Sequence, residues 1–161
     1  MKLEKAIFAC GCFWGVQHQF ERAHGVLRST VGYIGGHREH PTYPEVKAHT
    51  TGHAEATLVE FDAEETSFTE LCKLFFEIHE PAQTDRQGPD IGPQYRSEIF
   101  YLDENQRQEA QAVINLLRNK GYEVNTRLTP ASTFWPAEEY HHHYYDKTGG
   151  EPYCHIRIKK F

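Results

Sequence analysis

The sequence predicts an α+β fold: a split β-α-β (ferredoxin-like) core with a mixed sheet, extra helices and a long irregular C-terminal tail. Strand and helix patterns follow one another in the order β-α-β-β-α-β, then α-β, then a helix and the tail. They lack the regular crossovers of a fully parallel sheet, and neither a repeat nor a linker interrupts them. Residues 1–161 are therefore expected to form a single domain, of which 147–161 is a flexible tail.

The first elements follow from the spacing of apolar residues. Residues 5–10 form a short apolar run typical of a strand, and 13–23 carry apolar side chains three or four positions apart, as a helix does. Residues 26–33 are rich in β-branched side chains and 54–61 alternate, so both are predicted as strands. Between them, 37–52 is polar with two prolines and is predicted as a long loop, a feature often linked to function.

The next helix begins at a capping box. Ser67 and Glu70 have the spacing of this motif, and Pro81 ends the apolar stripe that follows them. Residues 81–94 are rich in glycine, proline and aspartate and should be irregular. Residues 95–102 are predicted as a strand.

The last third of the chain predicts two more helices and one more strand. A cap at 103–106 opens a helix that Gly121 ends, and 122–128 resembles a final strand. Pro136 is expected as the first residue of a short helix that runs to about residue 146.

Composition excludes several classes of protein. A net charge of −6 does not provide the basic face that a nucleic-acid-binding protein needs. No apolar run approaches the length of a membrane-spanning helix, and the N-terminus lacks the apolar core of a signal peptide. We expect a cytoplasmic monomer without nucleic-acid or membrane partners. In that compartment four cysteines are more often reduced, catalytic or metal-bound than paired in a permanent disulfide frame.

The strongest local signal surrounds Cys12, which falls where a strand should end and a helix begin. Backbone N–H groups and the positive end of the helix dipole favour an anion there, so the pKa of the thiol should fall and the reactive thiolate should form. Phe13 and Trp14 place two aromatic faces beside the sulfur. The alternative is an inert buried cysteine at a strand end, but the flanking glycines and the helix start favour a reactive one.

The segment Gly-Cys-Phe-Trp-Gly at 11–15 resembles the active-site segment of type A peptide methionine sulfoxide reductase (methionine-S-sulfoxide reductase). The likeness continues from about Ile7 to His155. It includes these segments: Gly32-Tyr-Ile-Gly-Gly36, Pro41-Thr-Tyr43, Gly52-His-Ala-Glu55, Glu80-Pro-Ala-Gln83, Gln94-Tyr-Arg-Ser97 and Ala137-Glu-Glu-Tyr-His141. The resemblance implies an oxidoreductase, a peptide-methionine (S)-S-oxide reductase without a cofactor, in which Cys12 attacks the sulfur of methionine sulfoxide and becomes a sulfenic acid. The substrate methyl group would pack against Phe13 and Trp14.

Glu55 matches the catalytic acid of that family. It begins a predicted strand whose odd-numbered residues share one apolar face, so burial should raise its pKa and keep it protonated. A protonated carboxyl near a reactive thiol can donate a proton to an oxygen. The alternative for a single glutamate at a strand end is a solvated side chain.

The resemblance also implies four supporting groups. Tyr43 and Tyr95 would donate hydrogen bonds to the sulfoxide oxygen, with Asp90 as a nearby supporting group and His141 as a further contact. Each has an ordinary alternative: a phenol at a loop edge is usually a packing residue, and histidines on surface helices are common.

The family also suggests how Cys12 would be recycled. Cys154 lies beside two glycines in the tail, and as the resolving cysteine it would form a disulfide with the oxidised Cys12, which thioredoxin would then reduce. The alternative is an incidental tail cysteine. Cys72 occupies a core position of a predicted helix, and Cys10 should be packed, since a Cys10–Cys12 disulfide would close a strained ring.

A metal-binding protein is the alternative to a thiol enzyme. Histidines gather in the loop 37–53 and again at 141–143, and Cys10 and Cys12 could add thiolates. Adjacent helical histidines point in different directions, however, and no Cys-x-x-Cys pair is present, so no metal site is predicted. The metal content of the purified protein and its thiol-dependent turnover would separate the two interpretations.

Overall fold

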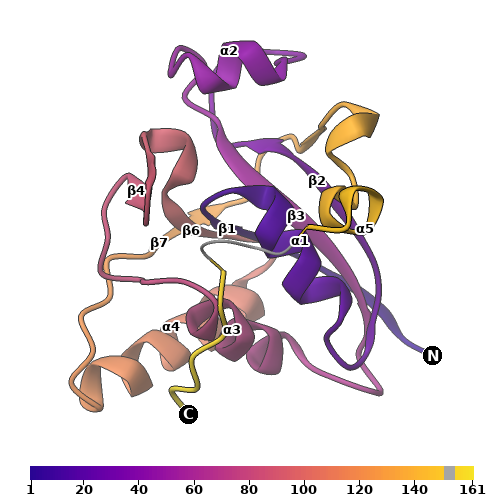
Figure 1. Cartoon of the computed structure of the whole chain (residues 1–161). Coiled ribbons are helices and arrows are strands. Elements are labelled where there is room, and N and C mark those ends of the chain that lie inside the picture. Colours follow the sequence, from indigo (N-terminus) through magenta and orange to yellow (C-terminus); the bar gives the residue numbers. More distant parts are fainter. Residues whose placement is uncertain (151–154) are drawn as a thin grey trace.

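The computed structural model describes residues 1–150 and 155–161, and its main feature is a six-stranded sheet (Figure 1). The sheet has the strand order β7-β6-β1-β3-β2-β8, and β4 and β5 form a separate two-stranded hairpin. In chain order the elements are β1 (Leu3–Cys10), α1 (Phe13–Glu21), β2 (Val26–Ile34), α2 (Tyr43–Lys47), β3 (Ala54–Asp62), α3 (Phe68–Glu77), β4 (Arg86–Gln87), β5 (Asp90–Ile91), the 3₁₀ helix η1 (Pro93–Tyr95), β6 (Ser97–Tyr101), α4 (Glu104–Asn119), β7 (Arg127–Pro130), β8 (Trp135–Pro136), the 3₁₀ helix η2 (Glu139–His141) and α5 (Tyr144–Thr148).

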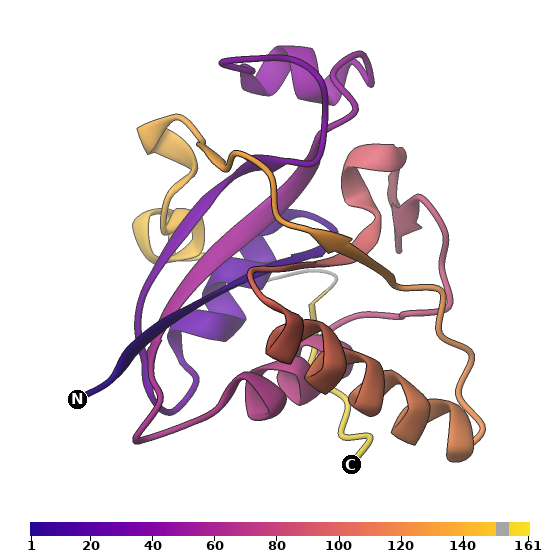
Figure 2. The same ribbon diagram turned by 180° about the vertical axis from the view of Figure 1, so that it is seen from behind.

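The four central strands confirm the predicted split β-α-β core. Strand β1 pairs antiparallel with β3 and β6, and β2 pairs antiparallel with β3, so that β3 separates the two strands that α1 connects. Strand β7 pairs parallel with β6, which makes the sheet mixed as expected. Helices α3 and α4 lie side by side at one end of the molecule and α2 at the other, as both ribbon views show (Figures 1 and 2).

Stacked phenylalanines fill the core between the sheet and its helices. The ring of Phe8 on β1 lies 4.9 Å from that of Phe20, 5.9 Å from that of Phe68 and 5.3 Å from that of Phe75, between centroids. Each buried ring contributes about 1.5–3 kcal/mol through removal of apolar surface from water. The resulting rigid layer fixes the C-terminal end of β1, and therefore the turn that carries Cys12.

Two predicted elements in the last third are wrong. Pro136 does not begin a helix; it lies in β8, which pairs with Gly32 of β2 at the edge of the sheet. An edge strand tolerates proline because its N–H side needs no partner. The strand predicted at 122–128 instead begins at Arg127, where pairing with β6 starts.

The predicted loop 37–52 contains a short helix, which was not predicted because prolines in this segment indicated a loop. Helix α2 begins with a capping box in which the Thr42 backbone N–H donates to Glu45 Oε1 at 3.1 Å, and Pro44 occupies the first turn, where no N–H is needed. Tyr95, predicted within a strand, ends η1. Tyr43 thus begins one helical turn and Tyr95 ends another.

The end of the predicted flexible tail is anchored to the body of the protein. The buried carboxylate of Glu77, at the C-terminal end of α3, accepts from Arg157 Nη2 at 2.8 Å and from the Lys160 backbone N–H at 2.9 Å. Its carbonyl accepts from the Ile158 N–H at 2.7 Å. Cys154 lies outside the described residues. Among the described helices, none has the length and apolar character needed to cross a membrane.

Candidate active site

Cys12 occupies the turn between β1 and α1, where it is the N-cap of the helix. Its carbonyl accepts from the N–H groups of Gly15 and Val16 at 3.2 and 3.4 Å, and the residue is 6 % exposed. Gly11, with φ of +105°, makes the tight turn that L side chains rarely adopt. The sulfur is therefore placed at the positive end of a helix dipole, as the sequence predicts.

Glu55 is buried beside this turn. The side chain on β3 is 1 % exposed, and the backbone N–H of Phe13 donates to its Oε1 at 3.3 Å. Burial raises the pKa of Glu55 to about 8, and the charge of Asp90 adds to this, while the Phe13 N–H and Lys47 oppose it. The solvated alternative for this glutamate is thus wrong: the carboxyl is mostly protonated at neutral pH. Its Oε2 is buried without a hydrogen-bond partner among residues 1–150 and 155–161, so a donor remains available there.

Two half-buried phenols share this environment. Burial, and after it the negative charges of Glu55, Cys12 and Asp90, raises the pKa of Tyr43 and of Tyr95 well above the usual range. Both phenols therefore keep their protons at neutral pH and can donate hydrogen bonds. Glu55, Cys12 and Asp90 are therefore near enough to both tyrosines for their charges to act on the phenols.

Trp14 and His141 form an aromatic wall next to this group. Trp14 Nε1–H donates to His141 Nδ1 at 2.9 Å, and its indole stacks on Tyr144 with ring centroids 3.9 Å apart. His141 is not on a helix surface: it is fully buried in η2, 5.2 Å from the Phe13 ring and 4.3 Å from the Tyr43 ring between centroids. Burial lowers the pKa of His141, so the ring is neutral and carries its proton on Nε2 when Nδ1 accepts from Trp14.

Phe13 differs from Trp14 in its exposure. The Phe13 ring has no exposed surface and packs against Tyr33 at 5.7 Å between centroids, whereas Trp14 is half-buried. Phe13 is therefore part of the core beside Cys12, and only Trp14 of the two keeps exposed surface.

Glu138, which was not predicted from the sequence, has a carboxylate that joins three segments. Its Oε1 accepts from the Tyr33 hydroxyl and its Oε2 from the Tyr43 backbone N–H, both at 3.0 Å. These bonds fix the start of α2, and with it the Tyr43 phenol, against β2. Two adjacent glutamates in a predicted helix gave no signal for this role, because the partners are far away in the sequence.

His155 is the second site residue that was not predicted from the sequence. It is 1 % exposed, and its Nε2 bonds to the Cys10 carbonyl at 2.7 Å. Its ring lies against the two glycines that flank Cys12: a Cβ added to Gly15 would be 2.3 Å from His155 Nδ1, and one added to Gly11 would be 3.2 Å from Nε2. The glycines of the Cys12 segment thus make room for a histidine from the C-terminal end of the chain.

Replacement of Gly15 by alanine should destabilise the protein by about 1–3 kcal/mol, although alanine favours a helix over glycine by about 1 kcal/mol. The expected cause is displacement of the His155 ring by the new methyl group. Urea unfolding of Gly15→Ala measures the loss. In a His155→Ala background the same substitution should be neutral or stabilising; equal losses in both backgrounds would contradict this packing.

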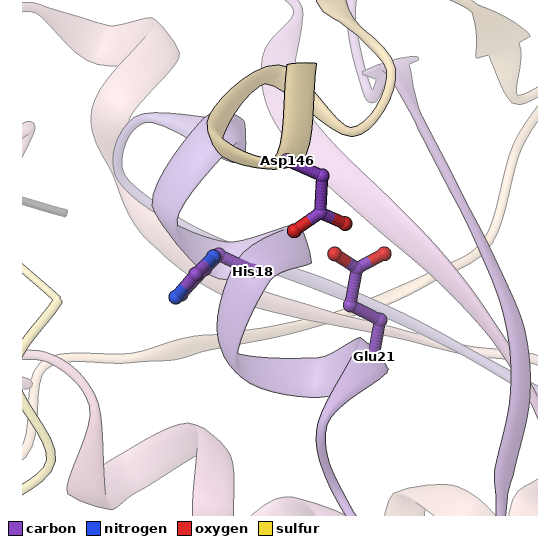
Figure 3. Close-up of side chains that lie close together, drawn as sticks. All are labelled: His18, Glu21 and Asp146. Carbon is purple, nitrogen blue, oxygen red and sulfur yellow. The ribbon is translucent and has the colours of Figure 1, made fainter. Parts of the chain in front are cut away.

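Outside this site, His18, Glu21 and Asp146 are the only group of potential metal ligands in the part of the chain that the structure describes, with ligand atoms within 4.8 Å of one another (Figure 3). Asp146 already bonds to Arg22 at 2.8 Å, and Glu21 to His143 at 2.6 Å. The group therefore acts as a contact that joins α5 to α1. The histidines of the loop 37–53 do not gather: His53, for example, bonds to the Gly36 N–H and the Arg38 carbonyl.

Comparison with known proteins identifies the family. A family model described as "Peptide methionine sulfoxide reductase" matches residues 4–161. Proteins named peptide methionine sulfoxide reductase MsrA are similar to this chain: that of Acinetobacter baumannii (strain AYE) is 44 % identical over 97 % of this chain and 90 % of its own length. That of Geobacter sulfurreducens is 48 % identical over 92 % and 93 %.

Solved structures agree with this result. Mxr1 from Saccharomyces cerevisiae in reduced form has a TM-score of 0.92 and 31 % identity, covering 99 % of this chain and 93 % of its own. Mxr1 in complex with Trx2 has a TM-score of 0.67 at 23 % identity, covering 99 % and 91 %, which shows the fold. The chain therefore belongs to the peptide methionine sulfoxide reductase family, as its Gly-Cys-Phe-Trp-Gly segment predicts.

Proposed function

We propose that this protein reduces methionine S-sulfoxide, as the amino acid or within proteins, with Cys12 as the nucleophile. The observation that carries the proposal is the pairing of a thiol at the start of α1 with a fully buried carboxyl whose pKa is about 8. A nucleophile and a proton donor adjacent to each other are what reduction of a sulfoxide requires.

The substrate methyl group packs against Trp14, with Phe13 beneath it. Glu55 and the phenols of Tyr43 and Tyr95 donate hydrogen bonds to the sulfoxide oxygen, and Asp90 supports the phenols by its charge. His141 holds the indole through its Nδ1. Methyl, oxygen and the remaining chain each have a distinct subsite for only one configuration at sulfur, which explains selection of the S epimer.

In the chemical step the Cys12 thiolate attacks the sulfoxide sulfur, and Glu55 transfers its proton to the oxygen. The attack joins the Cys12 sulfur to the substrate sulfur; the hydroxyl then passes to the Cys12 sulfur as the substrate sulfur–oxygen bond and the new sulfur–sulfur bond break, so that methionine leaves and Cys12 becomes a sulfenic acid. The substrate sulfur gains two electrons and the Cys12 sulfur loses two. No metal and no organic cofactor takes part in these steps.

Cys154 then condenses with the sulfenic acid, releases water and forms a disulfide, which thioredoxin reduces. Support for thioredoxin comes from the yeast relative Mxr1, solved in complex with Trx2. Cys10 and Cys72 are fully buried, and burial raises the pKa of the Cys72 thiol well above its usual range, which makes Cys72 a poor resolving group.

Residues 1–161 act as one catalytic domain and a monomer, in the cytoplasm, where a thioredoxin system is available.

To test the proposal, the reduced protein is mixed with one equivalent of methionine S-sulfoxide in the absence of a reductant, and its cysteines are then examined by mass spectrometry. One equivalent of methionine and a Cys12–Cys154 disulfide are expected, while the R epimer should leave both thiols unchanged. Unchanged thiols and no methionine with either epimer would refute the proposed function.

Replacement of Cys154 by serine should separate chemistry from recycling. The variant should form about one equivalent of methionine per protein and then stop when thioredoxin is the reductant, because the sulfenic acid has no partner thiol. Rapid-quench assays measure the first turnover, and steady-state assays measure cycling. Cys72→Ala, in the core, is the matched control and should cycle normally. Full cycling by Cys154→Ser would assign recycling to Cys10 or Cys72.

A further inference from the structure

Two isoleucines of the C-terminal segment are exposed although the segment is anchored. Ile156 and Ile158 are 68 % and 65 % exposed, whereas most of the other isoleucines are buried. They line a cavity of about 510 Å³, together with Tyr122, Pro89 and the C-terminal end of α3. Exposed aliphatic side chains beside a hollow are typical of a surface that another protein covers.

The backbone that carries these isoleucines is held in place on both sides. His155 precedes them and bonds to the Cys10 carbonyl, while Arg157 lies between them and bonds to Glu77. The Ile158 N–H donates to the Glu77 carbonyl at 2.7 Å. The two side chains are therefore presented by ordered backbone, which lowers the entropy cost of binding a partner.

Chain geometry places this surface within reach of any protein that attacks Cys154. Ile156 and Ile158 follow Cys154 by two and four residues, so their Cα atoms lie at most about 7 and 14 Å from that of Cys154. Small redox interfaces bury up to about 600 Å² on each partner, and a patch of that area has a radius of roughly 14 Å. An interface of that size centred on the Cys154 sulfur would cover Ile156 and reach Ile158.

We infer that Ile156, Ile158 and the adjoining cavity form the docking surface for thioredoxin during recycling. The inference rests on the proposed function, in which Cys154 belongs to the disulfide that thioredoxin reduces. A protein substrate needs to bring only one side chain to Cys12, so its contacts should centre on the half-buried side chains of Trp14 and Tyr43. A protein reductant must contact the surroundings of Cys154 instead.

The test compares two reductants on the double variant Ile156→Ser/Ile158→Ser. With thioredoxin, kept reduced by thioredoxin reductase and NADPH, the KM for thioredoxin should rise about tenfold or more, because two apolar contacts are lost. With dithiothreitol, which needs no docking surface, turnover should stay unchanged. Leu27→Ser is the matched control: its side chain is 51 % exposed at the start of β2 and should change neither assay.

The outcomes separate this inference from the proposed function. Absence of dithiothreitol-supported turnover in the unaltered protein would refute the proposed function. Normal turnover of the double variant with both reductants would refute the docking surface and leave the proposed function in place. The double variant could instead show a raised KM for a protein substrate and an unchanged KM for thioredoxin. That result would assign the surface to protein substrates and would also refute its role in thioredoxin docking.

Discussion

Replacing Cys12 by serine should abolish formation of methionine, with either thioredoxin or dithiothreitol and in a single turnover. A serine hydroxyl at the start of α1 stays protonated and cannot accept the sulfoxide oxygen in a two-electron step. Because the two side chains are similar in size and Cys12 is 6 % exposed, the free energy of unfolding should change by no more than about 1 kcal/mol.

The control for this variant is Cys72→Ala, which removes a thiol from the core instead of the site. It should lower stability by about 1–2 kcal/mol through loss of packing and leave the first turnover intact. Methionine formation by Cys12→Ser at more than trace rates would show that another group attacks the sulfoxide, and the mechanism would have to be abandoned.

Replacing Glu55 by glutamine should lower the single-turnover rate by about 10²- to 10⁴-fold, the usual contribution of a positioned general acid. Glutamine keeps the size of the side chain and can still accept from the Phe13 N–H, but it has no proton to transfer. The rate of the unaltered protein should fall as pH rises through about 8, where Glu55 ionises, and this fall should be absent from the residual activity of Glu55→Gln.

The same substitution should stabilise the protein at high pH. The Glu55 carboxyl ionises near its usual pKa in the unfolded chain but at about 8 in the folded protein, so the folded state holds more protons between these values. Stability contributed by this group is therefore present at low pH and is lost as pH rises toward 8, on the order of 2–4 kcal/mol. Urea unfolding at pH 5 and pH 8 should show a smaller difference for Glu55→Gln than for the unaltered protein; equal differences would mean that Glu55 is solvated.

The sequence predicted those parts of the fold that depend on local spacing. Alternation over 54–61 placed Glu55 on a buried face, and the glycines around Cys12 predicted the strand-to-helix turn. Pro136 was misplaced because proline suits both the first turn of a helix and an edge strand, and only pairing with β2 decides between them. Local patterns carry no information about that partner.

The same reason explains which site residues were missed. Glu138 and His155 act through bonds to residues about 100 or more positions away, such as the Tyr43 N–H and the Cys10 carbonyl. His141 was expected on a helix surface because its segment looked helical, but tertiary packing buries it against Trp14. Long-range contacts of this kind leave no periodic signal in one sequence.

The burial of His155 has a kinetic consequence for the residue before it. Adjacent Cα atoms are 3.8 Å apart, so Cys154 is tethered to a ring that rests against the glycines on either side of Cys12. Such a short tether gives the second thiol a local concentration in the millimolar range or above, independent of how much protein is present. In the proposed cycle, ring closure should therefore outpace bimolecular peroxide attack on the sulfenic acid and so protect Cys12 from irreversible oxidation to the sulfinic state.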